Sequence, residues 1–293
     1  MDQADSLRKI IKMNKAPKPL ARVIAVTSGK GGVGKSNTSI NLAIQLKKLG
    51  HRVIILDADF GLANIEIMFG TVPKYNLADL IYRGMSMQDI ISWGPGGVGF
   101  ISGGSGIVGL SNLSVEQFSY IVRSLSQLDD IADFIIVDTG AGISDAVLEF
   151  LVSSSEIVLV TTPEPTSITD SYSLLKALSQ HSQFSSELSP VKVLANRVEN
   201  EGEGNALFQK FNVVVERYLK LPIQYLGYVP QDPALAKAVM QQTPISLQNE
   251  NAKAAKAYER ITQRLLYGEE SQNVQKRGMA TFFAQILSGK KNS

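Results

Sequence analysis

Short apolar runs alternate with longer amphipathic stretches along most of the chain. Seven of these runs are rich in β-branched residues, and polar or glycine-containing segments separate them. They are Val23–Thr27, Val53–Asp57, Val98–Ile101, Phe134–Asp138, Ile157–Thr161, Val191–Ala195 and Ile223–Val229. A strand that is apolar at nearly every position is buried on both faces. The runs therefore predict a mostly parallel sheet with helices on both faces.

The stretches between the runs repeat their apolar positions with the period of an α-helix. They are Gly34–Leu49, Ser114–Leu128, Ile143–Ser153, Ile168–Gln180, Asn205–Leu219 and Asn249–Leu266. In the last stretch, Tyr258, Ile261 and Leu265 recur at helical spacing and are expected to pack against the body. The alternation of strands and helices predicts an α/β fold with a doubly wound sheet and right-handed crossovers.

The chain contains no cysteine and only two histidines, His51 and His181. This composition excludes disulfides, iron–sulfur clusters, cysteine-rich zinc sites and a thiol nucleophile. Any metal is expected to take oxygen ligands. No apolar run approaches the roughly 18–20 residues that cross a bilayer, and the first twenty residues lack the apolar segment of a secretory signal. We therefore expect a cytoplasmic protein.

The formal net charge of +2 is unevenly distributed along the chain. Residues 1–22 carry six basic and two acidic groups, and residues 276–293 carry four basic groups and no acidic one. The 253 residues between them hold 19 basic and 25 acidic groups. An acidic body with two basic ends argues against a broad nucleic-acid-binding face and favours contacts through the ends. Solvated charged termini without a partner are the plainer alternative.

The strongest chemical signal is the segment Gly29-Lys30-Gly31-Gly32-Val33-Gly34-Lys35-Ser36, which follows the first predicted strand and opens the first predicted helix. It satisfies the G-x-x-x-x-G-K-[ST] phosphate-loop pattern in its required context, and we add the next residue, Asn37, to the nucleotide-binding set. Backbone N–H groups of such a loop surround phosphate oxygens at a helix N-terminus. Lys35 is expected to reach the β- and γ-phosphates, and the Ser36 hydroxyl to bind Mg²⁺. Residues 94–109 contain eight glycines without a following Lys-Ser or Lys-Thr pair, and we interpret them as a structural loop.

Two carboxylates at strand ends predict a metal site beside this loop. Asp138 ends the run Phe134–Asp138, and Asp57 ends Val53–Asp57. In a doubly wound sheet, ligands bind at the carboxyl ends of the strands. An aspartate at a strand end is common by itself, but here two would converge on a phosphate loop. We therefore predict that Ser36, Asp57 and Asp138 hold the magnesium ion.

Lys30 is an additional lysine early in the loop, which is the deviant Walker A form. With it, residues 20–267 resemble the MinD/ParA class of phosphate-loop ATPases, a SIMIBI-class fold. The matching segments are Asp57-Ala-Asp59-Phe-Gly-Leu as switch I, Asp138-Thr-Gly-Ala-Gly142 as switch II, Thr162-Pro-Glu-Pro-Thr-Ser-Ile-Thr-Asp170, Asn196-Arg197 and Val229-Pro-Gln-Asp-Pro233. Switch II departs from the Asp-Ser-Pro-Ala-Gly of the class. The resemblance implies a slow, switch-type ATPase that uses ATP/ADP and Mg²⁺ and forms a homodimer in the ATP state.

The resemblance also implies roles for individual residues. Lys30 of one subunit would reach the phosphates of the other and supply charge in the transition state, as an arginine finger does. Lys35 would act on the phosphates of its own subunit, and Asp59 would orient the attacking water. The remaining nucleotide contacts would come from Asn196, Arg197, Pro230, Gln231 and Asp232, with adenine held by Asn196 and the 230–232 segment.

The C-terminal segment has the pattern of an amphipathic membrane-binding helix. One apolar helical stripe lies between basic flanks, formed by Met279, Phe282, Phe283, Ile286 and Leu287. A helix of this length would lie in the lipid interface and not span the bilayer. The alternative is a terminal helix that packs on its own domain. Iron–sulfur members of the class need cysteines, and DNA-partitioning members need a basic surface. The membrane-binding, MinD-like branch therefore fits this sequence best. It implies a protein attached to the cytoplasmic face of the cell membrane.

The N-terminal segment Asp2-Gln3-Ala4-Asp5-Ser6-Leu7-Arg8 resembles the D-Q-A-x-x-L-R motif of the FlhG family of MinD-like regulators of flagellar number and placement. This implies that residues 1–20 activate FlhF, a GTPase of the signal-recognition-particle type, through Asp2, Gln3, Ala4, Leu7 and Arg8. Components of the flagellar switch ring are further implied partners. A disordered tail is the plainer interpretation of the motif by itself.

These patterns divide the chain into three predicted parts. Residues 1–19 form the partner-activating segment, residues 20–267 the ATPase domain, and residues 268–293 a linker with the membrane-targeting helix. Two other functions remain open at this stage. One is a ParA-type ATPase that partitions DNA, and the other is a division-site MinD. A metabolic ATP-dependent enzyme would need a further catalytic cluster, which the sequence lacks.

Overall fold

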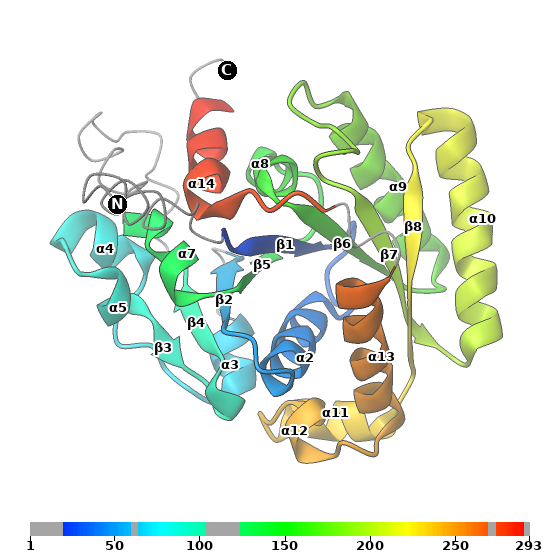
Figure 1. Cartoon of the computed structure of the whole chain (residues 1–293). Helices are drawn as coiled ribbons and strands as arrows, with labels where there is room; N and C mark the ends of the chain where they lie inside the picture. The colour runs from blue at the N-terminus through cyan, green and yellow to red at the C-terminus, as the bar shows by residue number, and fades with distance from the viewer. Residues whose placement is uncertain (1–19, 60–63, 104–123, 269–273, 290–293) are drawn as a thin grey trace, which may run out of the picture.

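The computed structural model describes residues 20–59, 64–103, 124–268 and 274–289. These residues build one eight-stranded sheet in the order β3-β4-β2-β5-β1-β6-β7-β8, with helices on both faces (Figure 1). The strands are β1 (Arg22–Thr27), β2 (Val53–Ala58), β3 (Ser92–Trp93), β4 (Gly99–Ser102), β5 (Phe134–Thr139), β6 (Glu156–Thr161), β7 (Val191–Val198) and β8 (Ile223–Pro230). The predicted doubly wound, mostly parallel sheet is confirmed.

Each of the seven predicted strands is present, and β3 is an addition. Strand β3 consists of Ser92 and Trp93 and pairs antiparallel with β4 at the sheet edge. All other neighbouring strands are parallel. Two residues are too short to carry a period of two, so the hydrophobic pattern could not reveal this strand.

The described helices are α2 (Lys35–Lys48), α3 (Asn64–Phe69), α4 (Leu77–Arg83), α5 (Met87–Ile90), α7 (Leu128–Ile131), α8 (Asp145–Ser153), α9 (Pro165–Gln180), α10 (Glu201–Leu219), α11 (Pro233–Met240), α12 (Ile245–Gln248), α13 (Lys253–Tyr267) and α14 (Gly278–Gly289), with a 3₁₀ turn, η1, at Pro95–Gly97. Helices α2, α8, α9, α10 and α13 match predicted ones. Helix α9 begins three residues earlier than predicted, at Pro165, because proline is tolerated in a first helical turn. Most of the predicted helix Ser114–Leu128 lies outside the described residues.

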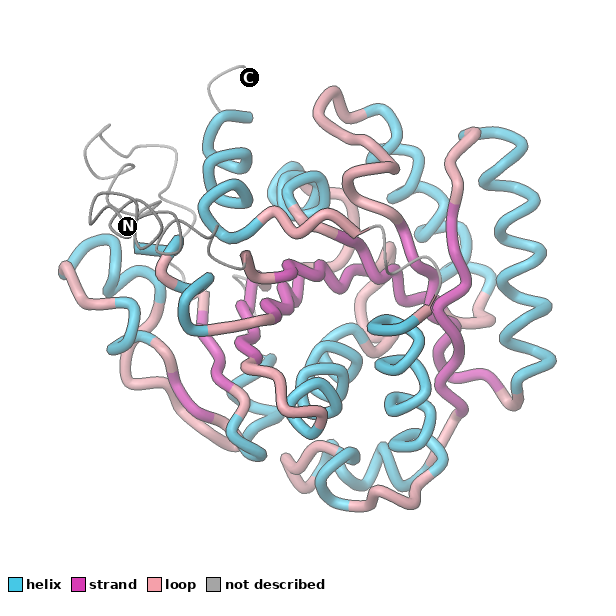
Figure 2. The backbone as a smooth tube through the Cα atoms, in the orientation of Figure 1, coloured by secondary structure: helices cyan, strands magenta, loops and turns pink. Residues whose placement is uncertain are grey.

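The two faces of the sheet carry separate layers of core. Alternate β1 residues Ile24 and Val26 pack with α2, α11, α12 and α13, whereas Val23 and Ala25 face the cores built with α7, α8, α9, α10 and α14. Figure 2 shows the strands running between these two groups of helices. Tyr258, Ile261 and Leu265 are buried on α13, as the helical spacing predicted.

Helix α14 lies against the body on the side of α7 and α8 (Figure 1). Met279, Phe282 and Ile286 are buried in the core that includes β1, β5 and α8. The Phe282 ring stacks on Phe150 of α8 with 5.9 Å between the ring centroids. Three of the five residues predicted to contact lipid therefore pack on the protein itself in this state. Among the described residues, no helix has both the length and the apolarity needed to cross a membrane.

The start of α14 is held by a buried carboxylate, from Asp129, and a half-buried guanidinium, from Arg277. Asp129 accepts hydrogen bonds from the Met279 N–H, at 3.0 and 3.1 Å, and from the Ala21 N–H at 3.1 Å. Arg277 donates to the Val152 carbonyl at the end of α8, at 2.8 Å. Burial lowers the pKa of Arg277. Gly278, between these two anchors, has a φ of +68°, a conformation that glycine adopts without strain.

Three buried ionic groups join the amino ends of β1, β6 and β7. Glu156 accepts hydrogen bonds from the Arg22 guanidinium at 2.5 and 3.0 Å and from the Lys192 ammonium at 2.8 Å. The Arg22 guanidinium also donates to the Leu265 carbonyl, at 2.9 Å. All three charged side chains are nearly inaccessible to solvent. This cluster therefore links three strands and the end of α13 at the edge of the sheet opposite the phosphate loop.

Candidate functional site

The phosphate loop joins the carboxyl end of β1 to the N-terminus of α2, as predicted. A side chain on Gly29 would collide with the backbone of Asp170 on α9, because an ideal Cβ there would lie 2.1 Å from the Asp170 carbonyl carbon. Gly34 has a φ of +101°, and its Cβ would lie 2.3 Å from the Asn196 side-chain nitrogen. Close backbone packing therefore requires glycine at position 29, and the backbone conformation favours it at position 34. Lys35 begins α2 and is buried.

Lys30 of this loop contacts the N-terminus of α9. Its ammonium group is 3.0 Å from a Glu164 carboxylate oxygen and 2.9 Å from the Thr166 hydroxyl. The Lys30 side chain is 40% exposed and that of Glu164 is 52% exposed. An exposed ion pair of this kind contributes at most about 1 kcal/mol to stability, so the lysine can leave it at little cost.

Asp138 is fully buried and fixed by two serine hydroxyls of α2. Ser36 donates to one carboxylate oxygen at 2.6 Å, and Ser39 donates to the other at 2.7 Å. Burial raises the pKa of Asp138 to about 6, although the two hydroxyl hydrogen bonds act to lower it. The sequence pattern identified Ser36 and Asp138 but missed Ser39. Ser39 follows Ser36 by three positions, which places both hydroxyls on one face of the helix.

Asp57 lies beside Asp138, because the two residues are register partners on the adjacent strands β2 and β5. Burial, and then the charge of Asp138, raises the pKa of Asp57 to about 7. The Asp57 carboxylate accepts hydrogen bonds from the N–H groups of Asp59, at 3.1 Å, and Ile65, at 3.3 Å. Two buried carboxylates this close repel one another, and a cation near them would relieve the repulsion.

The oxygen donors of Ser36, Asp57 and Asp138 fit a hard cation such as Mg²⁺. The described part of the chain contains no group of three or more His, Cys, Asp or Glu side chains arranged to hold a metal. The protein would therefore supply only part of the coordination sphere. Mg²⁺ is often bound in this way, with one or two carboxylates from the protein and the other ligands from phosphates and water.

Asp59, in the predicted switch I, lies near Gly140 of the predicted switch II. One of its carboxylate oxygens accepts a hydrogen bond from the Asn64 side chain at 3.2 Å. The other lies 3.9 Å from the position that a Cβ on Gly140 would occupy. Residues 60–63 of switch I lie outside the described residues. Asn64 was not among the predicted site residues, and its place in the first turn of α3 is the signal that could have identified it.

Asn196 and Arg197 approach the phosphate loop from the carboxyl end of β7. The Asn196 side chain donates to the Val33 carbonyl at 2.7 Å, and the Arg197 guanidinium donates to the Gly32 carbonyl at 2.6 Å. Asp232 instead caps two helices, since its carboxylate accepts from the N–H groups of Ala234 and Ala254. The predicted adenine contacts of Asn196 and the 230–232 segment stay predictions.

The other predicted site residues are not part of this edge of the sheet. Met279, Phe282 and Ile286 belong to the core beneath α14. The side chains of Phe283 and Leu287 lie outside the described part of the structure, and so do all residues of the predicted partner segment, which are Asp2, Gln3, Ala4, Leu7 and Arg8.

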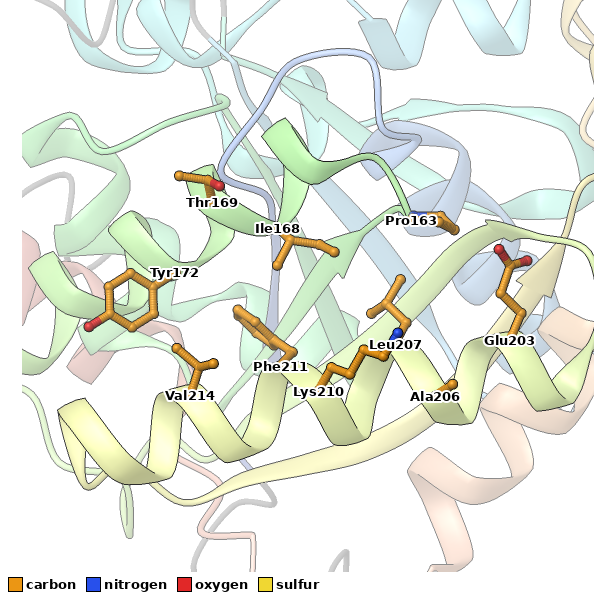
Figure 3. Close-up of a pocket in the computed structure, with 10 residues that line it drawn as sticks. All are labelled: Pro163, Ile168, Thr169, Tyr172, Glu203, Ala206, Leu207, Lys210, Phe211 and Val214. Atoms are coloured by element: carbon orange, nitrogen blue, oxygen red, sulfur yellow. The ribbon is translucent and has the colours of Figure 1, made fainter.

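A cavity of about 560 Å³ separates α9 from α10 (Figure 3). Its lining is mainly apolar and includes Tyr172, Phe211 and Val214, while Glu203 lies at the other end of the cavity in this view. Thr166 in the first turn of α9 and Glu164 at its N-cap hold Lys30. One helix therefore borders both the cavity and the phosphate loop. The sequence patterns gave no sign of this cavity.

Comparison with known proteins agrees with this geometry. A family model described as ParA, NUBPL iron-transfer P-loop NTPase, matches residues 19–266. The antiactivator FleN of Pseudomonas aeruginosa is 41% identical over 83% of this chain and 86% of its own length. The flagellum site-determining protein YlxH of Helicobacter pylori is 34% identical over 91% of this chain and 90% of its own length.

Solved structures share the fold. The septum site-determining protein MinD of Pyrococcus horikoshii, complexed with Mg-ADP, superposes with a TM-score of 0.65 at 21% identity, over 88% of this chain and 100% of that chain. Together with the phosphate loop, its early lysine and the two strand-end carboxylates, these similarities identify the family. The chain belongs to the MinD/ParA family of P-loop ATPases, in which it is similar to the flagellar regulators FleN and YlxH over most of its length.

Proposed function

We propose that this chain is an ATP-dependent switch that dimerises around ATP, hydrolyses it slowly, attaches to the inner membrane surface and regulates the number and placement of flagella. The observation that carries the proposal is the position of Lys30. Its side chain is 40% exposed, and its ammonium group is held only by Glu164 and Thr166 at the start of α9. From there it can supply charge to the phosphates of a second subunit.

In this proposal, different side chains of the site have separate roles in hydrolysis. Lys35 and the loop amides would hold the phosphates, while Ser36, Asp57 and Asp138 would hold Mg²⁺, which when bound would neutralise phosphate charge. Asp59, fixed by Asn64, orients the attacking water. Lys30 of the second subunit stabilises the charge that develops as the bond to the γ-phosphate breaks.

Size-exclusion chromatography with ATP and with ADP tests the switch. Asp59→Ala is expected to accumulate an ATP-bound dimer, because the water is no longer oriented and the nucleotide persists. Lys30→Ala is expected to bind ATP but to hydrolyse it without the acceleration that dimer formation gives. A monomeric Asp59→Ala protein at saturating ATP would contradict the proposal.

Membrane attachment requires α14 to leave the body, because Met279, Phe282 and Ile286 are buried beneath it. Burying each such side chain is worth about 1.5–3 kcal/mol, and transfer into lipid recovers a similar amount. The two positions of the helix are therefore close enough in free energy for dimerisation to decide between them. Two helices on one dimer bind a bilayer far more strongly than one.

The flagellar role rests on the N-terminal motif and on the similarity to FleN and YlxH. We propose that residues 1–20 activate an FlhF-type GTPase and that switch-ring components of the flagellum are further partners. A peptide of residues 1–20 is expected to raise the GTPase rate of the partner, and Gln3→Ala is expected to weaken this effect. Salt-sensitive DNA binding by the full chain, without liposome binding, would instead favour a DNA-partitioning function.

A further inference from the structure

Arg197 has an unusual backbone conformation at the carboxyl end of β7. Its φ is +58°, in the left-handed region that non-glycine residues rarely adopt. The pairing of β7 with β8 shifts register between Asn196 and Val198, so Arg197 is the extra residue of a β-bulge. Bulges beside functional sites often redirect a side chain. A strained residue of this kind persists only when its surroundings stabilise it.

The redirected side chain reaches the phosphate loop. The Arg197 guanidinium donates to the Gly32 carbonyl at 2.6 Å. The Arg197 N–H donates to the Asn196 side-chain oxygen at 2.9 Å, and the Asn196 nitrogen donates to the Val33 carbonyl at 2.7 Å. Two successive carbonyl groups of the loop are therefore fixed by two successive residues of one bulge.

Fixing these carbonyls also fixes the amides. In a trans peptide the C=O and N–H groups point in opposite directions. The carbonyls of Gly32 and Val33 point toward β7, so the N–H groups of Val33 and Gly34 point away from it. A phosphate loop binds anions with such amides.

The loop needs this external support because its own backbone is permissive. Gly32 has a φ of +76° and Gly34 has a φ of +101°. Glycine can adopt many other conformations, so ordering this segment around a phosphate would carry a large entropic cost. A loop that is already ordered before binding avoids that cost.

We infer that Arg197 is a positioning residue that holds the phosphate loop in its anion-binding conformation through the Gly32 carbonyl. It acts on the phosphate end of the nucleotide and does not need to touch the nucleoside. This inference rests on the proposed nucleotide-binding function and adds to it the residue that preorganises the loop.

Arg197→Gly tests the inference, because glycine accepts a φ of +58° without strain and lacks the guanidinium. We expect the affinity for Mg-ADP and for inorganic pyrophosphate with Mg²⁺ to fall by the same factor, about tenfold for a charged hydrogen bond. The melting temperature of the nucleotide-free protein is expected to stay equal or to rise. Weaker binding by a protein that is no less stable is a combination that general structural damage does not produce.

Lys220→Gly is the matched control. Lys220 has a φ of +52° at the exposed C-terminus of α10, away from the loop. This variant is expected to keep wild-type affinity for both ligands, whereas Arg197→Lys, which retains a cationic donor, is expected to recover part of the affinity that Arg197→Gly loses.

Three results would overturn the inference. The first is an unchanged pyrophosphate affinity in Arg197→Gly. The second is a loss of affinity for ADP alone, which would place Arg197 on the nucleoside. The third is a lowered melting temperature that accounts for the weaker binding. A wild-type protein that binds neither ADP nor pyrophosphate would instead refute the proposed function itself.

Discussion

The Asp129 carboxylate accepts the Met279 N–H with both of its oxygens, at 3.0 and 3.1 Å, and so caps the first turn of α14. Loss of such a cap typically costs about 0.5–2 kcal/mol. We expect Asp129→Ala to loosen α14 and to raise cleavage after Lys276 and Arg277 by added trypsin. Limited proteolysis followed by mass spectrometry measures this. Wild-type cleavage kinetics in Asp129→Ala would show that the cap does not hold the helix.

Substitutions of Phe150 and Phe282 are expected to change membrane binding by α14 in opposite directions. Phe150→Ala removes the ring on the body but leaves the helix sequence intact, so it is expected to increase liposome co-sedimentation in the absence of ATP. Phe282→Glu removes the apolar group from the helix itself and is expected to abolish co-sedimentation. If both variants lose binding to the same extent, release of α14 from the body does not control attachment.

Ser39 is expected to matter for the magnesium requirement. Ser39→Ala removes one of the two hydroxyls that fix Asp138, and its hydrogen bond acts to lower the Asp138 pKa. A carboxylate that is less well oriented and more readily protonated binds a cation more weakly. The Mg²⁺ concentration for half-maximal ATPase activity should rise several-fold, as a titration would reveal. Ser173→Ala, at an exposed site on α9, serves as the control and should behave as wild type.

The buried ionic cluster predicts unequal effects of two neutral substitutions. Glu156→Gln leaves Arg22 and Lys192 buried without their carboxylate and is expected to lower the free energy of unfolding by about 3–5 kcal/mol. Lys192→Met leaves the Arg22–Glu156 pair intact and should cost much less. Urea denaturation compares the two. Equal losses would mean that the carboxylate is not the centre of this cluster.

The sequence allowed the sheet and the phosphate loop to be predicted because both depend on local pattern. Most of the buried strands are nearly continuous apolar runs, and the loop residues from Gly29 to Ser36 are adjacent in the chain. Arg197 was assigned to the nucleotide site, but its contact with Gly32 spans 165 positions and depends on a bulge. No periodicity encodes a contact of that kind.

The surface against which α14 packs could not be predicted from its apolar stripe. A stripe that fits a lipid surface equally fits a protein groove, since both are apolar. Phe150 and Asp129, the residues that receive the helix here, lie more than 120 positions away from it and carry no motif. The helix itself was predicted correctly, whereas its packing in this state could be found only from the fold.

Leu20 and Gly278 are in contact, since a Cβ on Gly278 would lie 2.9 Å from the Leu20 side chain. Next to this contact, Arg277 donates a hydrogen bond to the Val152 carbonyl at the end of α8. The two basic segments of the chain therefore start from a single point. Under the proposed function, binding of α14 to a bilayer would therefore bring the N-terminal segment to the same membrane surface, and its search for a partner would become two-dimensional.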